Sequence, residues 1–242
     1  MALVFAGCGF NASNGASDAP LVGDAIAKDA HMGSSGSGSG SQANITYVQS
    51  AWGEDQSKQS QTVAFPNPQR AGNLNILAVG WYKTGTVASV TDTQQNAYQV
   101  AIGPTMTTDN DEYQTIYYAC GIAGGSNTVT VSFDDSNQDP EVRIAEYAGA
   151  AASDCYDASV ASIGNGSAVD SGTLTASPGE LLVAADKVYY ITSAGDPSYA
   201  LRLTSDFGDI VEDRIAPAAG SYHAMATQNM TGVWVMQLAA FR

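Results

Sequence analysis

Two acidic segments carry the residue types that most readily bind a metal ion. Residues 109–112 read Asp-Asn-Asp-Glu, and residues 134–139 read Asp-Asp-Ser-Asn-Gln-Asp. Calcium takes about six to eight hard oxygen ligands, which Asp and Asn side chains on flexible turns supply. The spacing differs from that of an EF-hand loop, and Asp- and Asn-rich turns that bind no metal are the open alternative. The pattern predicts a calcium site formed by Asp109, Asp111, Asp134, Asp135 and Asp139.

Aromatic side chains provide a second candidate site. The chain has 12 Tyr and 3 Trp against 6 Phe. Tyr and Trp combine an apolar ring with a polar tip, as sugar-stacking surfaces require. Adjacent rings on a strand point to opposite faces, so one ring of each pair would be exposed on an open sheet. Packing in a β core without a ligand is the alternative. The predicted ligand-binding residues are Trp52, Trp81, Tyr82, Tyr117 and Tyr190.

The three cysteines divide into a pair and a single residue. Cys120 and Cys155 are predicted to form a disulfide, because an even pair in a domain outside the cytoplasm usually does; two unlinked thiols are the alternative. Cys8 follows Phe5-Ala6-Gly7, a stretch that resembles the end of a bacterial lipoprotein signal, where small residues precede the acylated cysteine. The resemblance implies lipidation at Cys8. A chance cysteine, or a segment derived from an expression vector, is the alternative.

Catalytic arrangements are scarce. Of the two histidines, His31 lies in a linker and His223 lacks a Gly-x-Ser-x-Gly motif to complete a Ser-His-Asp triad. No close ligand spacing joins His223 to a cysteine as a zinc site would require. Carboxylates such as Glu146 and Glu212 are available as a glycosidase pair. We therefore assign no catalytic residue, and an enzyme that uses a carboxylate pair is kept as an alternative.

Lysines in strands raise a covalent alternative. Lys83 and Lys187 both fall within or beside predicted strands. A lysine amine is a nucleophile once it has lost its proton. A Lys–Asn isopeptide crosslink at either residue would lower the intact mass by one ammonia.

Composition and charge limit the classes of partner. Hydrophobic residues make up 44% of the 242 residues and charged residues only 14%, against about 25% in typical soluble domains. This composition favours a protein outside the cytoplasm, secreted or on the outer surface. The formal net charge of -15 repels phosphate backbones, so nucleic acid is not expected as a partner. No run approaches the ~20 apolar residues of a membrane-spanning helix.

The chain divides into a linker-like segment and one domain. Residues 1–42 are rich in Gly, Ser, Ala and Asp, and Gly33–Ser41 is a Gly/Ser linker. Such a composition cannot offset its ordering entropy, so we expect a flexible tether or vector-derived segment. Residues 43–242 are expected to form the folded domain.

Short β-type runs recur throughout residues 43–242. Asn127–Phe133 alternates strictly, which predicts a half-buried strand. No long period-3.6 pattern is present, so the predicted fold is an all-β antiparallel sandwich, jelly-roll-like, in one large domain. Residues 72–79 and 179–185 look alike and are predicted central strands; two similar halves are an alternative to one sandwich. The predicted strands cover 45–50, 62–65, 75–82, 88–92, 97–101, 113–120, 127–133, 142–147, 157–163, 172–176, 181–190, 200–204, 210–215, 221–228 and 233–241.

A series of short motifs resembles a known type of module. The series includes Ser89-Val90-Thr91-Asp92, Asn96-Ala97-Tyr98, Ile116–Ala119, Gly125–Val131 and Ala145-Glu146-Tyr147-Ala148-Gly149, and it closes at Trp234–Gln237. It resembles an uncharacterised β-sandwich module of secreted and surface proteins of soil and gliding bacteria. The resemblance covers about residues 43–242 and implies a fold and a compartment, but no active site.

These observations lead to three functional hypotheses. The first is a non-catalytic binding or adhesion module for a polysaccharide or a cell-surface partner, with calcium as the one candidate cofactor. The second is a structural or assembly subunit, forming homo-oligomers or pairing with other proteins through sheet edges, with Leu181–Tyr190 and the C-terminal strand as candidate edges. The third is the carbohydrate-active enzyme.

Overall fold

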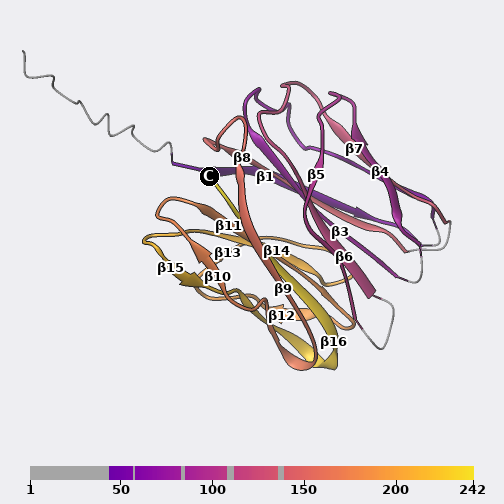
Figure 1. Ribbon diagram of the computed structural model, residues 1–242. Helices are drawn as coiled ribbons and strands as arrows, with labels where there is room; N and C mark the ends of the chain where they lie inside the picture. Colours follow the sequence, from indigo (N-terminus) through magenta and orange to yellow (C-terminus); the bar gives the residue numbers. More distant parts are fainter. Residues whose placement is uncertain (1–43, 57, 83–84, 108–111, 136–138) are drawn as a thin grey trace, which may run out of the picture. The chain divides into compact units, whose positions relative to one another are not determined.

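The computed structural model describes residues 44–56, 58–82, 85–107, 112–135 and 139–242. Gly40–Arg242 form one compact unit. The part of the chain that the structure describes contains strands and turns and is all-β, as predicted (Figure 1). No helix in these ranges is long and apolar enough to cross a membrane.

Sixteen strands are numbered along the described chain. The first eight are β1 (Thr46–Glu54), β2 (Ser60–Ala64), β3 (Leu74–Tyr82), β4 (Val87–Asp92), β5 (Gln99–Met106), β6 (Glu112–Ala119), β7 (Thr128–Phe133) and β8 (Glu141–Ala148). The second eight are β9 (Tyr156–Asp170), β10 (Leu174–Ala176), β11 (Leu181–Val188), β12 (Thr192–Ala194), β13 (Ala200–Thr204), β14 (Ile210–Ile215), β15 (Gly220–Tyr222) and β16 (Met225–Phe241).

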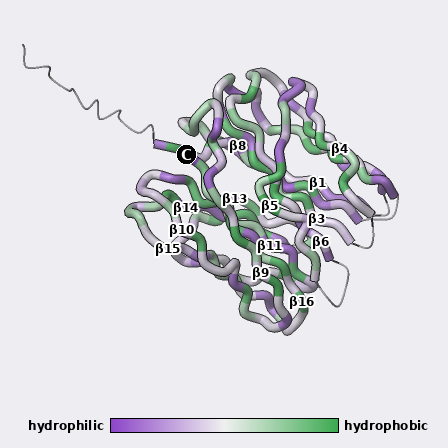
Figure 2. Tube along the Cα trace, viewed as in Figure 1, coloured by the Kyte–Doolittle hydropathy of each residue, from purple (hydrophilic) through white to green (hydrophobic). Residues whose placement is uncertain are grey.

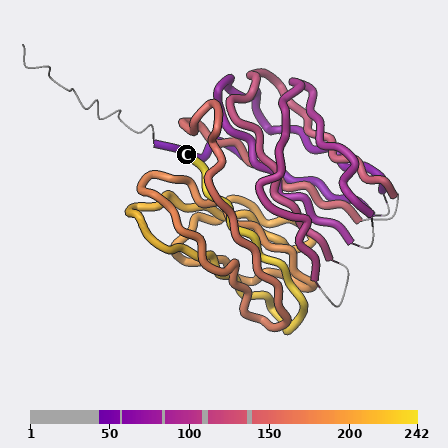
Figure 3. Tube along the Cα trace, viewed as in Figure 1, coloured from indigo at the N-terminus to yellow at the C-terminus, as the bar shows by residue number. Residues whose placement is uncertain are grey.

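The two sets of strands have the same order in their main sheets. The first main sheet runs β1-β8-β3-β6-β5, and the second runs β9-β16-β11-β14-β13, with β12 added beside one end of β16. The cross-strand register also repeats: Leu74 on β3 faces Tyr147 on β8, and Leu181 on β11 faces Phe241 on β16. The alternative of two similar halves therefore holds for strand order, within one compact unit (Figure 3).

The sheets within this unit stack in four layers. A three-stranded sheet, β2-β7-β4, packs on the outer face of the first main sheet, and the β10-β15 pair packs on the outer face of the second. The two main sheets pack on each other through small and branched side chains such as Ile76, Ala145, Val183 and Ala239. Hydrophobic and hydrophilic residues are mixed along the chain (Figure 2). Burial alternates along β7 in the outer sheet, whereas the central strands β3 and β11 are buried along almost their whole length because both of their faces are covered.

Central and edge positions differ in part from those expected. Strands β3 and β11 are central, as predicted, because each is paired on both sides. The expectation that Leu181–Tyr190 and the C-terminal strand form open edges is wrong. Strand β11 lies between β14 and β16, and β16 lies between β11 and β9.

Strand β9 is longer than the predicted 157–163, since it continues through Gly164 and Gly166 to Asp170. Glycine within a strand pattern often marks a bulge or a turn. However, a Cβ on Gly164 would lie 2.2 Å from the Trp234 ring. Glycine at this position therefore allows close packing of two paired strands rather than a reversal of the chain.

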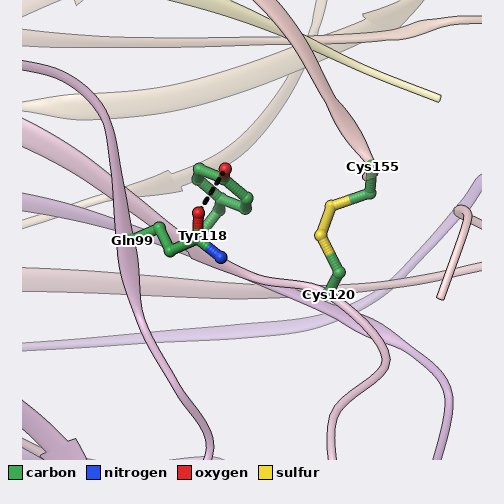
Figure 4. The surroundings of a disulfide bond; sticks show 4 residues. All are labelled: Gln99, Tyr118, Cys120 and Cys155. Atoms are coloured by element: carbon green, nitrogen blue, oxygen red, sulfur yellow. Dashed lines mark hydrogen bonds between the residues drawn. A yellow bond between two sulfur atoms is a disulfide. The ribbon is translucent and has the colours of Figure 1, made fainter. Parts of the chain in front are cut away.

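A disulfide joins the two halves. Cys120 directly follows β6 and Cys155 directly precedes β9, and their sulfur atoms are bonded with a Cα–Cα distance of 6.0 Å (Figure 4). Cys155 is buried in the core between the two main sheets. Beside the bond, Tyr118 donates a hydrogen bond to Gln99 Oε1 at 3.1 Å. The crosslink closes a loop over a sequence separation of 35 residues.

Removing this disulfide should destabilise the fold. A crosslink restricts the unfolded chain, so Cys120→Ser with Cys155→Ser should lower the free energy of unfolding by about 2–5 kcal/mol. Urea denaturation of the variant and of the non-reduced wild type measures this difference. Alkylation of unreduced, denatured protein, followed by peptide mass mapping, should leave both cysteines unlabelled. Labelling of both would contradict the bond.

Candidate functional site

A cavity of about 340 Å³ lies where β3 and β11 end and β6 begins. Aromatic side chains line part of it, and hydrogen-bonding or charged groups line the rest. Among these aromatic residues, Tyr189 has 49% of its surface exposed. The lining includes Tyr82, Tyr189, Phe207, Gln56, Glu112 and Lys187.

An ionic contact forms the floor of the cavity. Lys187 Nζ lies 3.0 Å from Asp209 Oδ2 and 3.4 Å from Glu112 Oε2. Lys187 also lies over the Phe207 ring, with its Nζ 5.6 Å from the ring centroid. Burial alone would lower the pKa of Lys187, but the carboxylates of Asp209 and Glu112 raise it above its usual range, so the amine is held in its charged form.

Below the floor, Arg143 crosses between the two main sheets. It projects from β8 with no exposed surface. Its Nη2 donates to Gln114 Oε1 at 2.6 Å on the same sheet, and its Nη1 donates to the Ile210 carbonyl at 2.7 Å on the facing sheet. Gln114 in turn donates to the Ala185 carbonyl at 2.8 Å. These hydrogen bonds connect two faces that elsewhere pack largely through apolar side chains.

Among the residues that the structure describes, four carboxyl groups surround these two cations. Glu112, Glu141, Asp186 and Asp209 surround Lys187 and Arg143, and all six side chains are at most 10% exposed. With every group ionised, the cluster would carry two excess negative charges in a dry interface, which is costly. Retention of two protons by the carboxyl groups makes the cluster neutral.

The pKa directions agree with that balance. Burial, with the Asp209 charge added, raises the pKa of Glu141 well above its usual value and that of Asp186 to about 7. Burial also raises the pKa of Glu112. Burial alone would raise the pKa of Asp209 as well, but Lys187 and Arg143 hold it below its usual range. Asp209 is therefore the ionised partner, and Glu141 is an acid that retains its proton.

The predicted aromatic residues do not form one surface. Trp81 is 2% exposed in the outer core of the first half, where it stacks on Tyr113, so it presents no face to a ligand. Trp52 packs against the core between the main sheets, and Tyr117 packs against the outer core. Tyr82 lines the cavity.

Tyr190 lies next to the cavity rather than in its lining. Its ring contacts Tyr189 edge-on, with the ring centroids 4.9 Å apart, and Tyr189 rather than Tyr190 is the cavity residue. Lys187, Val188 and Tyr189 line the cavity in succession, and Tyr190 follows them after β11 has ended.

The predicted calcium ligands are only partly described. Asp109 and Asp111 lie outside the described residues. Asp134 binds the backbone N–H and the hydroxyl of Thr86, both at 2.7 Å, as a turn residue does. Among the residues that the structure covers, no group of three or more His, Cys, Asp or Glu side chains is arranged to hold a metal ion, Asp135 and Asp139 included. The calcium site stays a prediction.

The two carboxylates considered for catalysis, Glu146 and Glu212, lie on opposite sides of the pair of main sheets. Glu146 is fully buried on the outer side of the first main sheet and accepts a 2.6 Å hydrogen bond from Asn73 Nδ2. Glu212 is fully buried on the outer side of the second main sheet, since its neighbour Val211 faces the central core. The two main sheets stand between them, so they cannot flank one substrate bond. His223 contacts Asp170 at 3.2 Å near the surface.

The ionic cluster was the feature that sequence reasoning missed as a site. Asp186 and Lys187 stand side by side within the otherwise apolar run of β11. A pair of charges at consecutive positions places one on each face of a buried strand, and both then require buried partners. That pair was the available signal.

The charge state of Glu212 gives a testable pH dependence. Burial and the charges of Asp186 and Asp196 raise its pKa from 4.5 to about 8. Between these values the folded protein keeps a proton that the unfolded chain has released, so this contribution to stability falls as pH rises, by up to ~1.4 kcal/mol per pH unit. Glu212→Gln removes the titration.

Urea unfolding at pH 5 and pH 8 should therefore show the wild type losing stability relative to Glu212→Gln. Comparing the two proteins cancels the contributions of titrating groups that do not interact with Glu212. Parallel pH dependences would contradict the raised pKa.

Comparison with known proteins gives no family: no family model, no curated protein and no solved structure matches the chain. The function has to be inferred from the cavity and the cluster beneath it.

Proposed function

We propose that the protein is a non-catalytic binding or adhesion module that acts outside the cytoplasm and binds a polysaccharide in the cavity beside Tyr82 and Tyr189. The observation that supports it is the joint lining of this cavity by aromatic rings and hydrogen-bonding side chains. The apolar faces of sugar rings stack on aromatic side chains, while sugar hydroxyls need donors and acceptors at the same place.

The size and polarity of the cavity fit a short part of a sugar chain. Its volume of about 340 Å³ is at the lower end of the ~300–1,000 Å³ that is typical of small-ligand sites. Gln56 supplies both a donor and an acceptor, and Glu112 also lines the cavity. Because Lys187 is already paired with Asp209, the floor offers little free charge to an ionic ligand.

The proposed compartment rests on composition and covalent structure. Only 14% of the residues are charged, and the Cys120–Cys155 disulfide would persist in an oxidising compartment but not in a reducing cytosol. Lipidation at Cys8, which lies outside the described residues, would tether the module to a membrane surface without a spanning segment.

Binding of the full chain to a glycan and polysaccharide array tests this function. Tyr82→Ala and Tyr189→Ala should each weaken binding roughly tenfold, which corresponds to about 1.4 kcal/mol. Tyr222→Ala is the matched control, because it removes the same side chain from β15 and does not line this cavity.

Each array is run with calcium and with a chelator. Binding that needs calcium would support the predicted metal site, and binding that survives the chelator would leave the aromatic rings as its basis. Absence of binding across the array, or equal weakening in the control variant, would contradict the proposal.

A second candidate function, assembly through sheet edges, is favoured by exposed apolar residues on true edge strands. On β5, Val100 is 50% exposed, and on β13, Leu201 is 54% exposed. Both strands have a partner on only one side among the described residues. Pro104 and two register shifts interrupt β5, which makes β13 the better pairing surface. Concentration-dependent oligomers in sedimentation experiments, lost in Leu201→Lys, would favour assembly over sugar binding.

A further inference from the structure

Lys187 on β11 and Asp209, which directly precedes the neighbouring antiparallel strand β14, meet inside the protein. The Lys187 Nζ to Asp209 Oδ2 distance is 3.0 Å, and the two side chains are 7% and 0% exposed. Each residue lies two positions beyond Ala185 and Val211, the last pair of the β11–β14 ladder, so the backbone places them opposite each other. An amine and a carboxyl group held at contact distance need no diffusional encounter to react.

The two oxygens of Asp209 have different surroundings. Oδ1 accepts a hydrogen bond from the backbone N–H of Val188 at 2.8 Å, whereas Oδ2 faces the lysine. When a nucleophile adds to a carboxyl carbon, one oxygen gains negative charge, and a fixed backbone N–H stabilises it. Oδ1 has this support, which leaves Oδ2 as the oxygen that can depart.

Glu141 provides an acid beside this pair. It has no exposed surface, and within the described part of the chain no donor group hydrogen-bonds to either of its oxygens. Its carboxyl group neighbours that of Asp209, to which a protonated Glu141 can donate. Gly80 leaves the space for these groups, since a Cβ there would lie 2.9 Å from Lys187 Cδ and 3.2 Å from Glu141 Oε2.

We propose that Lys187 and Asp209 form an intramolecular isopeptide bond, with Glu141 as the group that transfers the proton. The ammonium first gives a proton to Oδ2, and the amine then adds to Cγ of Asp209, placing negative charge on Oδ1. Glu141 protonates Oδ2, which leaves as water, and takes a proton back from Nζ. One C–N bond forms, one C–O bond breaks, and Glu141 ends as it began.

The condensation removes a buried ion pair from the interface between the main sheets. The reaction replaces a buried cation and a buried anion by a neutral amide, which removes the cost of keeping both charges out of water. The released water has a way out, because Lys187 lines the open cavity. The bond differs from a Lys–Asn crosslink in that it releases water, not ammonia. Lys83, the other candidate from the sequence, lies outside the described residues.

Mass spectrometry of the full chain tests the proposal directly. After denaturation and reduction, the intact mass should be about 18 Da below the sequence mass, the loss of one water. Trypsin does not cleave after an acylated lysine, so digestion should give residues 144–202 joined to residues 203–214. An intact mass equal to the sequence mass, with residues 144–187 and 188–202 released separately, would overturn the bond.

Three variants identify the source of the loss. Lys187→Arg keeps the positive charge without the reactive amine and should restore the full mass. Glu141→Gln keeps the shape without a transferable proton and should leave Lys187 and Asp209 unjoined. Lys58→Arg, at an exposed lysine that pairs with Asp55, is the control and should keep the loss.

Two results would count against the mechanism or the bond. A water loss that persists in Lys187→Arg would come from another dehydration, such as cyclisation at an aspartate, and would overturn the bond. Complete crosslinking in Glu141→Gln would overturn the role of that residue.

Discussion

The alignment of the two halves depends on one buried cation. Arg143 reaches from the first main sheet to the Ile210 carbonyl on the second, and its other donor is held by Gln114. The surrounding interface consists of small and branched apolar side chains, which would tolerate several alignments. A directional hydrogen bond in a dry interface selects one of them, because every other alignment leaves a buried charge without its partners.

The same strand order in the two halves makes their differences informative. Where Arg143 faces Ala78 in the first half, Gln237 faces Ala185 at the matching place in the second. The four carboxyl groups and Lys187 of the ionic cluster lie together at one end of the interface. The strand order is thus common to the two halves, whereas the side chains that form the site differ between them. Gly80 belongs to this asymmetry, since Lys187 occupies its matching position on β11 and needs the space that glycine leaves.

The class of fold and most strands could be predicted from the sequence. A strand with one buried face alternates apolar and polar residues, as β7 does, and this alternation is visible in the sequence. It did not separate a glycine that breaks a strand from one that fits under an aromatic ring, as Gly164 does under Trp234. The site was harder still, because Lys187 and Glu141 are far apart in the chain, and only the packing of one sheet on the other brings them together. Local sequence patterns do not predict how the two sheets pack on each other.

Strand β1 runs from the end of the sheets where the described chain begins and ends to the end that bears the cavity. It begins beside Ala148, at the end where Arg242 donates a hydrogen bond to the Cys155 carbonyl at 2.8 Å, and it runs to the end where Gln56 borders the cavity. The chain therefore enters and leaves the sheets at one pole, and the cavity opens at the other. Neither end of the described chain therefore obstructs a ligand that enters the cavity.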